Sequence, residues 1–476
     1  MDDTPAQGPA APRTTPAARA KPAGARPKAK AGASAKATRT RTTAGKTGAR
    51  GSGSSAATAP ATVAAPPAGP DGTAGDPSGS VPRSERGPWR GTRGRATYSR
   101  RIQRANERWP VAARAVAGLL SRPELVLTVL GEREPVERDG RVLNRGVQAL
   151  LALATRVDGG RGGPERGTRP SDPVAMRAQL RRTTSLAMPV RTDVHAWGRL
   201  VPGPEGAPPV PVRIYRRYGS GLGIGGGERL LPGIVYYHGG SWVTGDLDTH
   251  DASCRLLAAT ARCLVVAVDY RLAPEHPFPA AVDDAVAAYA WVQRHAEELG
   301  VDPHRVGVMG DSAGGNLAAV VALETRDGGG DLLPPAAQGL IYPVVDARLD
   351  TGTVRTLADG FFLTSEAMEE ARRLYLPHPG DWTAWRASPL LAEDHRGVAP
   401  ALVVTAGFDP LRDDGSNYAE ALRAAGVPVE YRCYDDQVHG FMGMGILPDS
   451  LALATEVCDA MGRLLRRSDQ RSPSGR

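Results

Sequence analysis

The segment Gly310-Asp311-Ser312-Ala313-Gly314 follows a short apolar strand, expected over residues 306–309, and precedes a helix expected from about residue 316. A serine on such a sharp turn stands above the end of a sheet, and the flanking glycines let the backbone turn without clashes. The N-terminus of the following helix favours negative charge that develops beside it. Taken alone, the pattern also fits a plain glycine turn between a strand and a helix.

Short apolar segments and candidate helices alternate on both sides of this turn. This alternation predicts a mostly parallel sheet with helices on both faces, which is an α/β fold. Ligands then bind at the carboxyl ends of the strands. The segments expected as strands are 210–215, 234–237, 264–268, 306–309, 339–342, 402–405 and 429–433, and the helices among them are 280–299, 316–324, 413–425 and 451–465.

A second glycine-rich loop, His238-Gly239-Gly240-Ser241-Trp242, follows the expected strand 234–237 and resembles the HGGG loop of lipases. Glycines allow a backbone to approach a substrate closely, so that its N–H groups can bind an oxyanion. We expect His238 to brace this loop rather than to act as a base. The alternative is an ordinary Gly-Gly turn without a catalytic role.

A serine nucleophile needs a histidine base and an acid that orients it. Of the nine histidines, His439 lies just after the last expected strand, where a loop can reach the top of the sheet. Asp409 follows the strand 402–405 and can hold the imidazole, whereas Asp413 and Asp414 lie one turn further on and are expected to cap the next helix. The order Ser312, Asp409, His439 is the order of α/β-hydrolases.

These motifs together resemble the hormone-sensitive-lipase (GDXG) family of esterases, over roughly residues 191–465. The resemblance rests on five separated motifs that occur in the family's order: 235–242 with Asp246, Thr249 and His250 behind it, 269–280, 310–317, 409–413 and 439–441. It implies an α/β-hydrolase fold with a helical cap. It also implies a carboxylic ester hydrolase with a preference for short acyl chains.

The resemblance further implies an oxyanion hole, for which the candidates are Gly239, Gly240, Ser241 and Ala313. In the family the donors are the residues at the second and third glycine positions and the residue after the nucleophile, here Gly240, Ser241 and Ala313. Ser241 replaces a glycine but keeps a backbone N–H, so the hole survives if its φ and ψ are allowed. Met309 stands where the family usually has a small residue, which we expect to affect packing.

The expected reaction is attack of Ser312 on an ester carbonyl, departure of the alcohol and hydrolysis of the acyl-enzyme by water. No metal or cofactor is implied, and the expected partner is a small-molecule ester. An amidase, formamidase or lactonase using the same residues is the alternative. A non-catalytic binder of small molecules on this fold is a third possibility, which the presence of His439 disfavours.

The glycine-rich loops offer little side-chain surface for selecting a substrate, so other segments must form the wall of the pocket. Apolar residues at helical spacing occur over 109–130, 142–156 and 174–188, and we assign residues 96–190 to an N-terminal helical cap. A second segment, with a helix expected over 365–375, follows the nucleophile. We expect Trp242, Phe361 and Phe362 to contact the substrate, the phenylalanines as part of the lid over the acyl pocket.

The first hundred residues carry 17 Lys and Arg against 5 Asp and Glu, whereas the remainder carries 42 against 46. The whole positive excess therefore lies outside the catalytic domain, which we place at residues 191–468. Residues 1–95 are rich in Ala, Pro, Gly, Lys and Arg and are expected to be disordered, since they offer little apolar surface to bury. The basic part could bind nucleic acid or anionic lipid, or it could be a solvated extension without a specific partner, which we favour.

The four cysteines form no CxxC pair, and a reduced compartment fits them. The beginning of the chain has no apolar run of the length of a secretory signal, and residues 116–130 are too short and too charged to span a bilayer. We therefore expect a cytoplasmic protein with no transmembrane segment and no specific nucleic-acid partner. A homodimer is possible.

Overall fold

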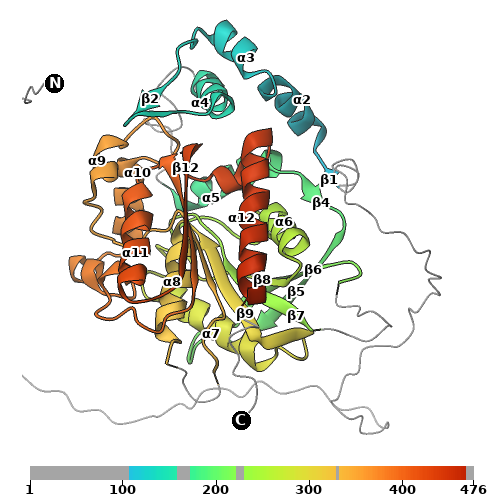
Figure 1. Cartoon of the computed structure of the whole chain (residues 1–476), viewed down its shortest axis with the longest axis vertical. Coiled ribbons are helices and arrows are strands. Elements are labelled where there is room, and N and C mark those ends of the chain that lie inside the picture. Colours follow the sequence, from blue (N-terminus) through green and yellow to red (C-terminus); the bar gives the residue numbers. More distant parts are fainter. Residues whose placement is uncertain (1–106, 158–171, 221–229, 328–331, 468–476) are drawn as a thin grey trace, which may run out of the picture. The chain divides into compact units, whose positions relative to one another are not determined.

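The computed structural model describes residues 107–157, 172–220, 230–327 and 332–467, all within the unit Thr92–Arg476. The extension predicted over residues 1–95 lies outside these ranges. A central sheet of eight strands, in the order β12-β11-β10-β9-β7-β8-β6-β5, organises the described part (Figure 1). Its strands are β5 (Val194–Val201), β6 (Val210–Arg217), β7 (Leu231–Tyr237), β8 (Leu264–Val268), β9 (Val301–Asp311), β10 (Gln338–Ile341), β11 (Ala401–Phe408) and β12 (Val429–Val438).

In the sheet, β12, β11, β10, β9, β7 and β8 run parallel to one another. At the other edge, β6 is antiparallel to β8, and β5 is antiparallel to β6. Every residue of β7, β8, β10 and β11 is buried, which is what a parallel sheet covered on both faces requires. The predicted α/β-hydrolase fold, with a mostly parallel sheet between helices, is confirmed.

Successive side chains of a strand point to opposite faces, and this alternation separates two hydrophobic cores. In β8, Val266 packs into the core beneath α7 (Ala280–Arg294), α8 (Ala313–Glu324) and α11 (Arg412–Ala424). Its neighbour Val265 packs into the core beneath α6 (Asp251–Ala261) and α12 (Pro448–Arg467) on the other face. The sheet is therefore the middle layer of a three-layer arrangement.

The predicted helical region before the sheet contains α2 (Val111–Leu120), α3 (Pro123–Leu130), α4 (Arg145–Val157) and α5 (Pro173–Ala187). The stretch 109–130 forms two helices rather than one. Pro123 lies at the first turn of α3, where its missing N–H costs nothing, but it disfavours helical geometry at the residue before it. Short two-stranded pairs lie beside these helices: β1 (Glu107–Arg108) with β4 (Val190–Arg191), and β2 (Glu137–Arg138) with β3 (Arg141–Val142).

A third hydrophobic cluster joins these N-terminal helices to the ends of the sheet strands. Leu127 and Val147 pack in it with Phe408, the last residue of β11, and with Val438, the last residue of β12. The helices therefore lie against the carboxyl edge of the sheet. A further insertion between β10 and β11 holds α9 (Gly352–Thr356), α10 (Ser365–Tyr375), η1 (Pro379–Thr383) and η2 (Pro389–Leu391), and η3 (Phe441–Gly443) follows β12.

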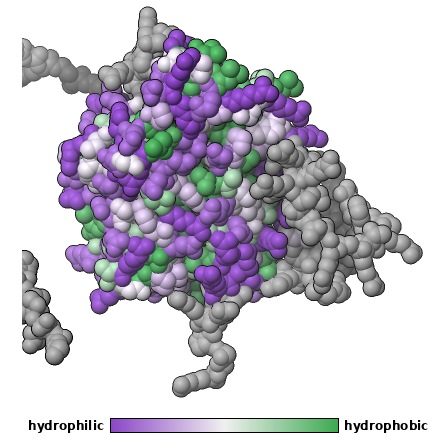
Figure 2. All heavy atoms as spheres, turned by 45° about the horizontal axis from the view of Figure 1, so that its top comes forward, coloured by the Kyte–Doolittle hydropathy of each residue, from purple (hydrophilic) through white to green (hydrophobic). Residues whose placement is uncertain are grey.

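The surface seen in Figure 2 is mostly hydrophilic, with small hydrophobic patches between the polar residues. Within the described ranges, no helix combines the length and the hydrophobicity that crossing a membrane needs.

Candidate active site

Ser312 occupies the turn between β9 and α8, with φ 56° and ψ −120°. A non-glycine residue rarely adopts this conformation, and two backbone hydrogen bonds hold it: the N–H of Ser312 donates to the carbonyl of Ile341 (2.8 Å), and the N–H of Asn316 donates to the carbonyl of Ser312 (3.1 Å). A Cβ at Gly310 would overlap with the carbonyl of Gly314, and one at Gly314 would overlap with the carbonyl of Tyr237. The two glycines are therefore required for this turn.

Ser312, His439 and Asp409 form a continuous hydrogen-bonded chain. His439 Nε2 lies 3.0 Å from Ser312 Oγ, and His439 Nδ1 lies 2.9 Å from Asp409 Oδ2. The other oxygen of Asp409 accepts the N–H of Leu411 at 2.8 Å, so the carboxylate is fixed in orientation. Each of the three residues directly follows a strand, β9, β12 and β11 respectively, which brings them to one edge of the sheet.

The two alternative acids have other partners. Asp413 accepts the N–H of Thr353 at 3.0 Å, and Asp414 accepts the N–H groups of Val345 and Asp346 at 3.2 and 3.3 Å. Neither is hydrogen-bonded to His439 in the described part of the chain. The geometry therefore favours Asp409 over both.

The loop after β7 adopts the tight backbone that its glycines suggest. Gly240 has φ 121°, and a Cβ there would overlap with the backbone of Thr244, whereas Ser241 and Trp242 take left-handed conformations at φ 56° and 58°. The N–H groups of Gly240, Ser241 and Ala313 make no hydrogen bond within the described residues. Ser241 thus keeps an unpaired backbone N–H within the described residues, although its positive φ is uncommon for a residue other than glycine.

The prediction that Gly239 belongs to the oxyanion hole needs correction. Its N–H donates to Asp311 Oδ1 at 3.0 Å and is therefore occupied. The available donors are those of the other three candidates.

Comparisons with known proteins agree with this geometry. Residues 234–443 match a family model described as alpha/beta hydrolase fold. The chain is 44% identical over 303 residues to the carboxylic ester hydrolase LipN of Mycobacterium tuberculosis, covering 62% of this chain and 77% of the relative. The chain belongs to the hormone-sensitive-lipase type of α/β-hydrolase esterases.

Two further comparisons extend this result. The ethyl acetate hydrolase of Pseudomonas putida is 40% identical over 236 residues, which are 50% of this chain and 72% of that protein. A solved ester hydrolase from the metagenome of Lake Arreo, in complex with a derivative of bipyridine phosphonate, superposes with a TM-score of 0.60 at 38% identity. That comparison covers 67% of this chain and 98% of the solved one. The predicted enzyme class, a carboxylic ester hydrolase, is confirmed.

In this esterase, Asp311 joins the serine turn to the oxyanion loop. Its Oδ1 accepts the hydroxyl of Tyr236 at 2.6 Å as well as the N–H of Gly239, and His250 Nε2 lies 3.5 Å away. Burial by itself would raise the pKa of Asp311, but His250 and the hydroxyl of Tyr236 outweigh it and lower the pKa to about 2. Asp311 is therefore a carboxylate across the physiological pH range, a role that was not predicted.

His238 supports the oxyanion loop through its contacts with Tyr270, as expected. Its ring stacks on Tyr270 with the centroids 4.3 Å apart, and the hydroxyl of Tyr270 donates to the carbonyl of His238 at 2.7 Å. Burial, followed by the proximity of His250, lowers the pKa of His238 to about 4. The ring is thus neutral at neutral pH, and its Nδ1 lies 2.8 Å from the carbonyl oxygen of Gly239, to which it can donate a hydrogen bond.

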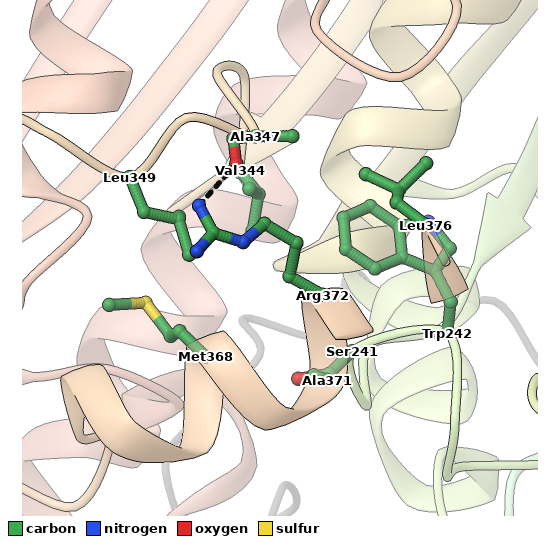
Figure 3. A pocket seen from close by; sticks show the side chains of 9 residues that line it. All are labelled: Ser241, Trp242, Val344, Ala347, Leu349, Met368, Ala371, Arg372 and Leu376. Atoms are coloured by element: carbon green, nitrogen blue, oxygen red, sulfur yellow. Dashed lines mark hydrogen bonds between the residues drawn. The ribbon is translucent and has the colours of Figure 1, made fainter. Parts of the chain in front are cut away.

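A narrow pocket lies beside Ser241 (Figure 3). Its side chains come from the loop after β7, from the segment after β10, and from α10 and the residue that follows it. Trp242 forms part of its wall and stacks on Tyr375 with the centroids 4.3 Å apart. The lining residues are Ser241, Trp242, Val344, Ala347, Leu349, Met368, Ala371, Arg372 and Leu376. Of the three residues expected to contact the substrate, only Trp242 lines this pocket.

The two phenylalanines lie elsewhere. Phe361 is buried in the third hydrophobic cluster, where its ring lies 5.1 Å from that of Phe408. Phe362 is 40% exposed, and its ring would lie 3.3 Å from a Cβ placed at Gly440, the residue after His439. The structure therefore assigns the wall of this pocket to α10 and to the segment after β10 rather than to these rings.

The sequence reasoning also missed Tyr342, whose ring centroid lies 4.5 Å from that of His439. Tyr342 follows β10 and takes an unusual φ of 36°. Its position at the end of the expected strand 339–342, at the edge where Ser312, Asp409 and His439 gather, was the available signal.

Proposed function

We propose that this chain hydrolyses esters of short carboxylic acids with Ser312 as nucleophile, His439 as general base and acid, and Asp409 as the residue that orients the imidazole. The observation that carries the proposal is the hydrogen-bonded chain from Ser312 Oγ through both nitrogens of His439 to Asp409. Such a chain activates a serine hydroxyl that would otherwise be a weak nucleophile.

In the first step, Ser312 Oγ attacks the ester carbonyl while its proton moves to His439 Nε2. The oxyanion that forms accepts hydrogen bonds from the free N–H groups of Gly240, Ser241 and Ala313, and the N-terminus of α8 adds favourable dipoles. The protonated His439 then gives its proton to the leaving alcohol. Water, activated by the same histidine, hydrolyses the acyl-enzyme and releases the acid.

The size of the pocket supports a short acyl group. Its volume is about 20 Å³, which is little more than the ~10–15 Å³ that one water molecule needs, so even a short acyl group requires some side-chain movement and a long one requires more. The similarity to an ethyl acetate hydrolase points in the same direction. We therefore expect kcat/KM to fall as the acyl chain of an ethyl ester lengthens from acetate through butyrate to octanoate.

We infer that residues 96–190 act as a cap on the catalytic domain at 191–468. Support comes from the third hydrophobic cluster, in which residues of α3 and α4 pack with Phe408 and Val438, the residues directly before Asp409 and His439. A cytoplasmic location, the absence of a specific nucleic-acid partner and a homodimer remain predictions, which cell fractionation, heparin retention and light scattering would test.

The test of the function is the rate of hydrolysis of ethyl acetate and ethyl butyrate by the wild type and by Ser312→Ala. We expect the variant to keep its melting temperature and to lose kcat by a factor on the order of 10⁶. Acetamide and butyramide, measured alongside, distinguish an esterase from an amidase. A folded Ser312→Ala variant with activity within tenfold of the wild type would refute the proposed mechanism.

A further inference from the structure

The pocket beside the oxyanion loop contains one charged side chain, that of Arg372, among mostly apolar neighbours. Figure 3 shows its guanidinium between Leu349 and Met368 on one side and Trp242 and Leu376 on the other. A cation in such surroundings loses hydration, which is unfavourable unless other groups compensate it. We therefore ask whether groups of the protein itself compensate the charge of Arg372, as expected for a purely structural side chain.

Three groups of the protein partly compensate Arg372. Its Nη1 donates to the carbonyls of Ala347 and Arg348, at 3.1 and 2.9 Å, and its guanidinium lies over the ring of Trp382, 3.9 Å from the centroid. These are dipoles and a ring face, and none of them carries a full negative charge. Nε is buried without a hydrogen-bond partner.

The neighbouring arginines differ in this respect. Arg373, the next residue of α10, pairs with Glu370, and Arg348 pairs with Asp346 through two nitrogens. In the described part of the chain, Arg372 forms no ion pair with a carboxylate. A guanidinium with an unused Nε–H and no counter-ion is suited to bind a carboxylate, for which its planar fork matches the geometry.

We propose that Arg372 binds a carboxylate at the far end of the acyl group, so that this esterase accepts monoesters of short dicarboxylic acids. The inference rests on the proposed esterase function. Ser241, an oxyanion-loop donor, lines the same pocket, so an acyl group whose carbonyl oxygen binds there extends toward Arg372. Hydrolysis releases the alcohol and the free dicarboxylate, with water as the only co-reactant.

The pocket must widen to admit this substrate. Met368 and Leu349 flank the guanidinium, and an unbranched methionine changes its rotamer readily to make room. A carboxylate in this position would give Arg372 the charge partner that the described residues do not provide.

The experiment compares monoethyl succinate with ethyl butyrate, which share ethanol as leaving group and differ by a carboxylate in place of a terminal methyl group. Release of ethanol gives kcat/KM for the wild type, Arg372→Met, Arg372→Lys and the control Arg373→Met. We expect wild-type kcat/KM for monoethyl succinate to equal or exceed that for ethyl butyrate. The ratio of the two should fall at least tenfold in Arg372→Met, less in Arg372→Lys and by less than twofold in Arg373→Met.

A purely structural Arg372 would lower both activities equally and leave the ratio unchanged, which would overturn the proposal. A wild-type ratio below about 0.01 would overturn it as well, even if Arg372→Met failed to fold. Failure of the folded wild type to hydrolyse ethyl acetate or ethyl butyrate would contradict the proposed function itself. The two results are therefore distinguishable.

Discussion

The carboxylate of Asp311 accepts the backbone N–H of Gly239 at 3.0 Å and thereby connects the serine turn to the oxyanion loop, 72 positions earlier in the chain. The same oxygen accepts the hydroxyl of Tyr236. One buried side chain thus fixes the distance between Ser312, the proposed nucleophile, and the backbone N–H groups that we propose bind the oxyanion. Catalysis depends on such preorganised placement.

Asp311→Asn should reduce kcat/KM by about tenfold to a hundredfold and lower the free energy of unfolding by about 1–3 kcal/mol, since a neutral amide forms weaker hydrogen bonds with Gly239 and Tyr236 than a carboxylate does. Asp327→Asn is the matched control, because Asp327 is highly exposed and pairs only with Arg326 at the surface. Kinetics with ethyl butyrate and urea unfolding measure both effects. Equal, small changes in the two variants would show that Asp311 does not organise the site.

Gly314→Ala should prevent formation of the serine turn, because the added Cβ would overlap with the carbonyl of Tyr237. We expect a loss of at least about 3 kcal/mol of stability and nearly all activity. Gly380→Ala provides the comparison, since a Cβ at Gly380 meets no atom within 4 Å. A folded and active Gly314→Ala variant would contradict the description of this turn.

Asp414 should make stability fall as pH rises. Burial raises the pKa of Asp414 to about 8, although the N–H groups of Val345 and Asp346 act against it. Between the ordinary aspartate pKa of 3.8 and about 8, the folded protein therefore binds more protons than the unfolded chain, and linkage makes the free energy of unfolding decrease with pH. Asp414→Asn, which mimics the protonated acid, removes this dependence.

The expected result is a stabilisation by Asp414→Asn that grows from pH 5 to pH 8.5, measured by urea unfolding at both values. Asp381→Asn, in the η1 segment, which contains no buried residue, should show no such trend. A constant or decreasing difference between Asp414→Asn and the wild type would show that Asp414 is ionised in the folded state.

Met368→Ala should widen the pocket and shift preference toward longer acyl chains by about 1–3 kcal/mol in relative transition-state binding. The measurement is the ratio of kcat/KM for ethyl octanoate to that for ethyl acetate. Phe362→Ala, which was the sequence-based choice, should change this ratio by less than about twofold because Phe362 lies outside the pocket. The opposite order of effects would place the acyl wall at Phe362 instead.

The three residues of the hydrogen-bonded chain could be singled out from the sequence because the sequence patterns that mark them are local. Each of Ser312, Asp409 and His439 follows an apolar strand directly. The glycines beside Ser312 are a second local signal, because a sharp turn leaves no room for a Cβ at these positions. The strand β5 was missed because it is an edge strand with several exposed residues, which weakens the apolar alternation.

The pocket could not be predicted in the same way. Its lining joins Ser241 and Trp242 to Met368 and Arg372, which are more than a hundred positions away, and only the packing of α10 brings them together. Asp311 was given no role from the sequence, since nothing in the sequence reveals that its carboxylate accepts an N–H from the oxyanion loop. Long-range contacts between loops leave no periodic signal.

The central claim is that Ser312 is the nucleophile, and covalent labelling tests it most directly. The wild type should be incubated with diethyl p-nitrophenyl phosphate, which phosphorylates an activated serine, and analysed by intact mass and peptide mapping. We predict one diethylphosphoryl group per chain, located on Ser312, with loss of esterase activity in proportion to labelling. An inactivated enzyme labelled at another residue, or an active enzyme that takes up no label, would contradict the account.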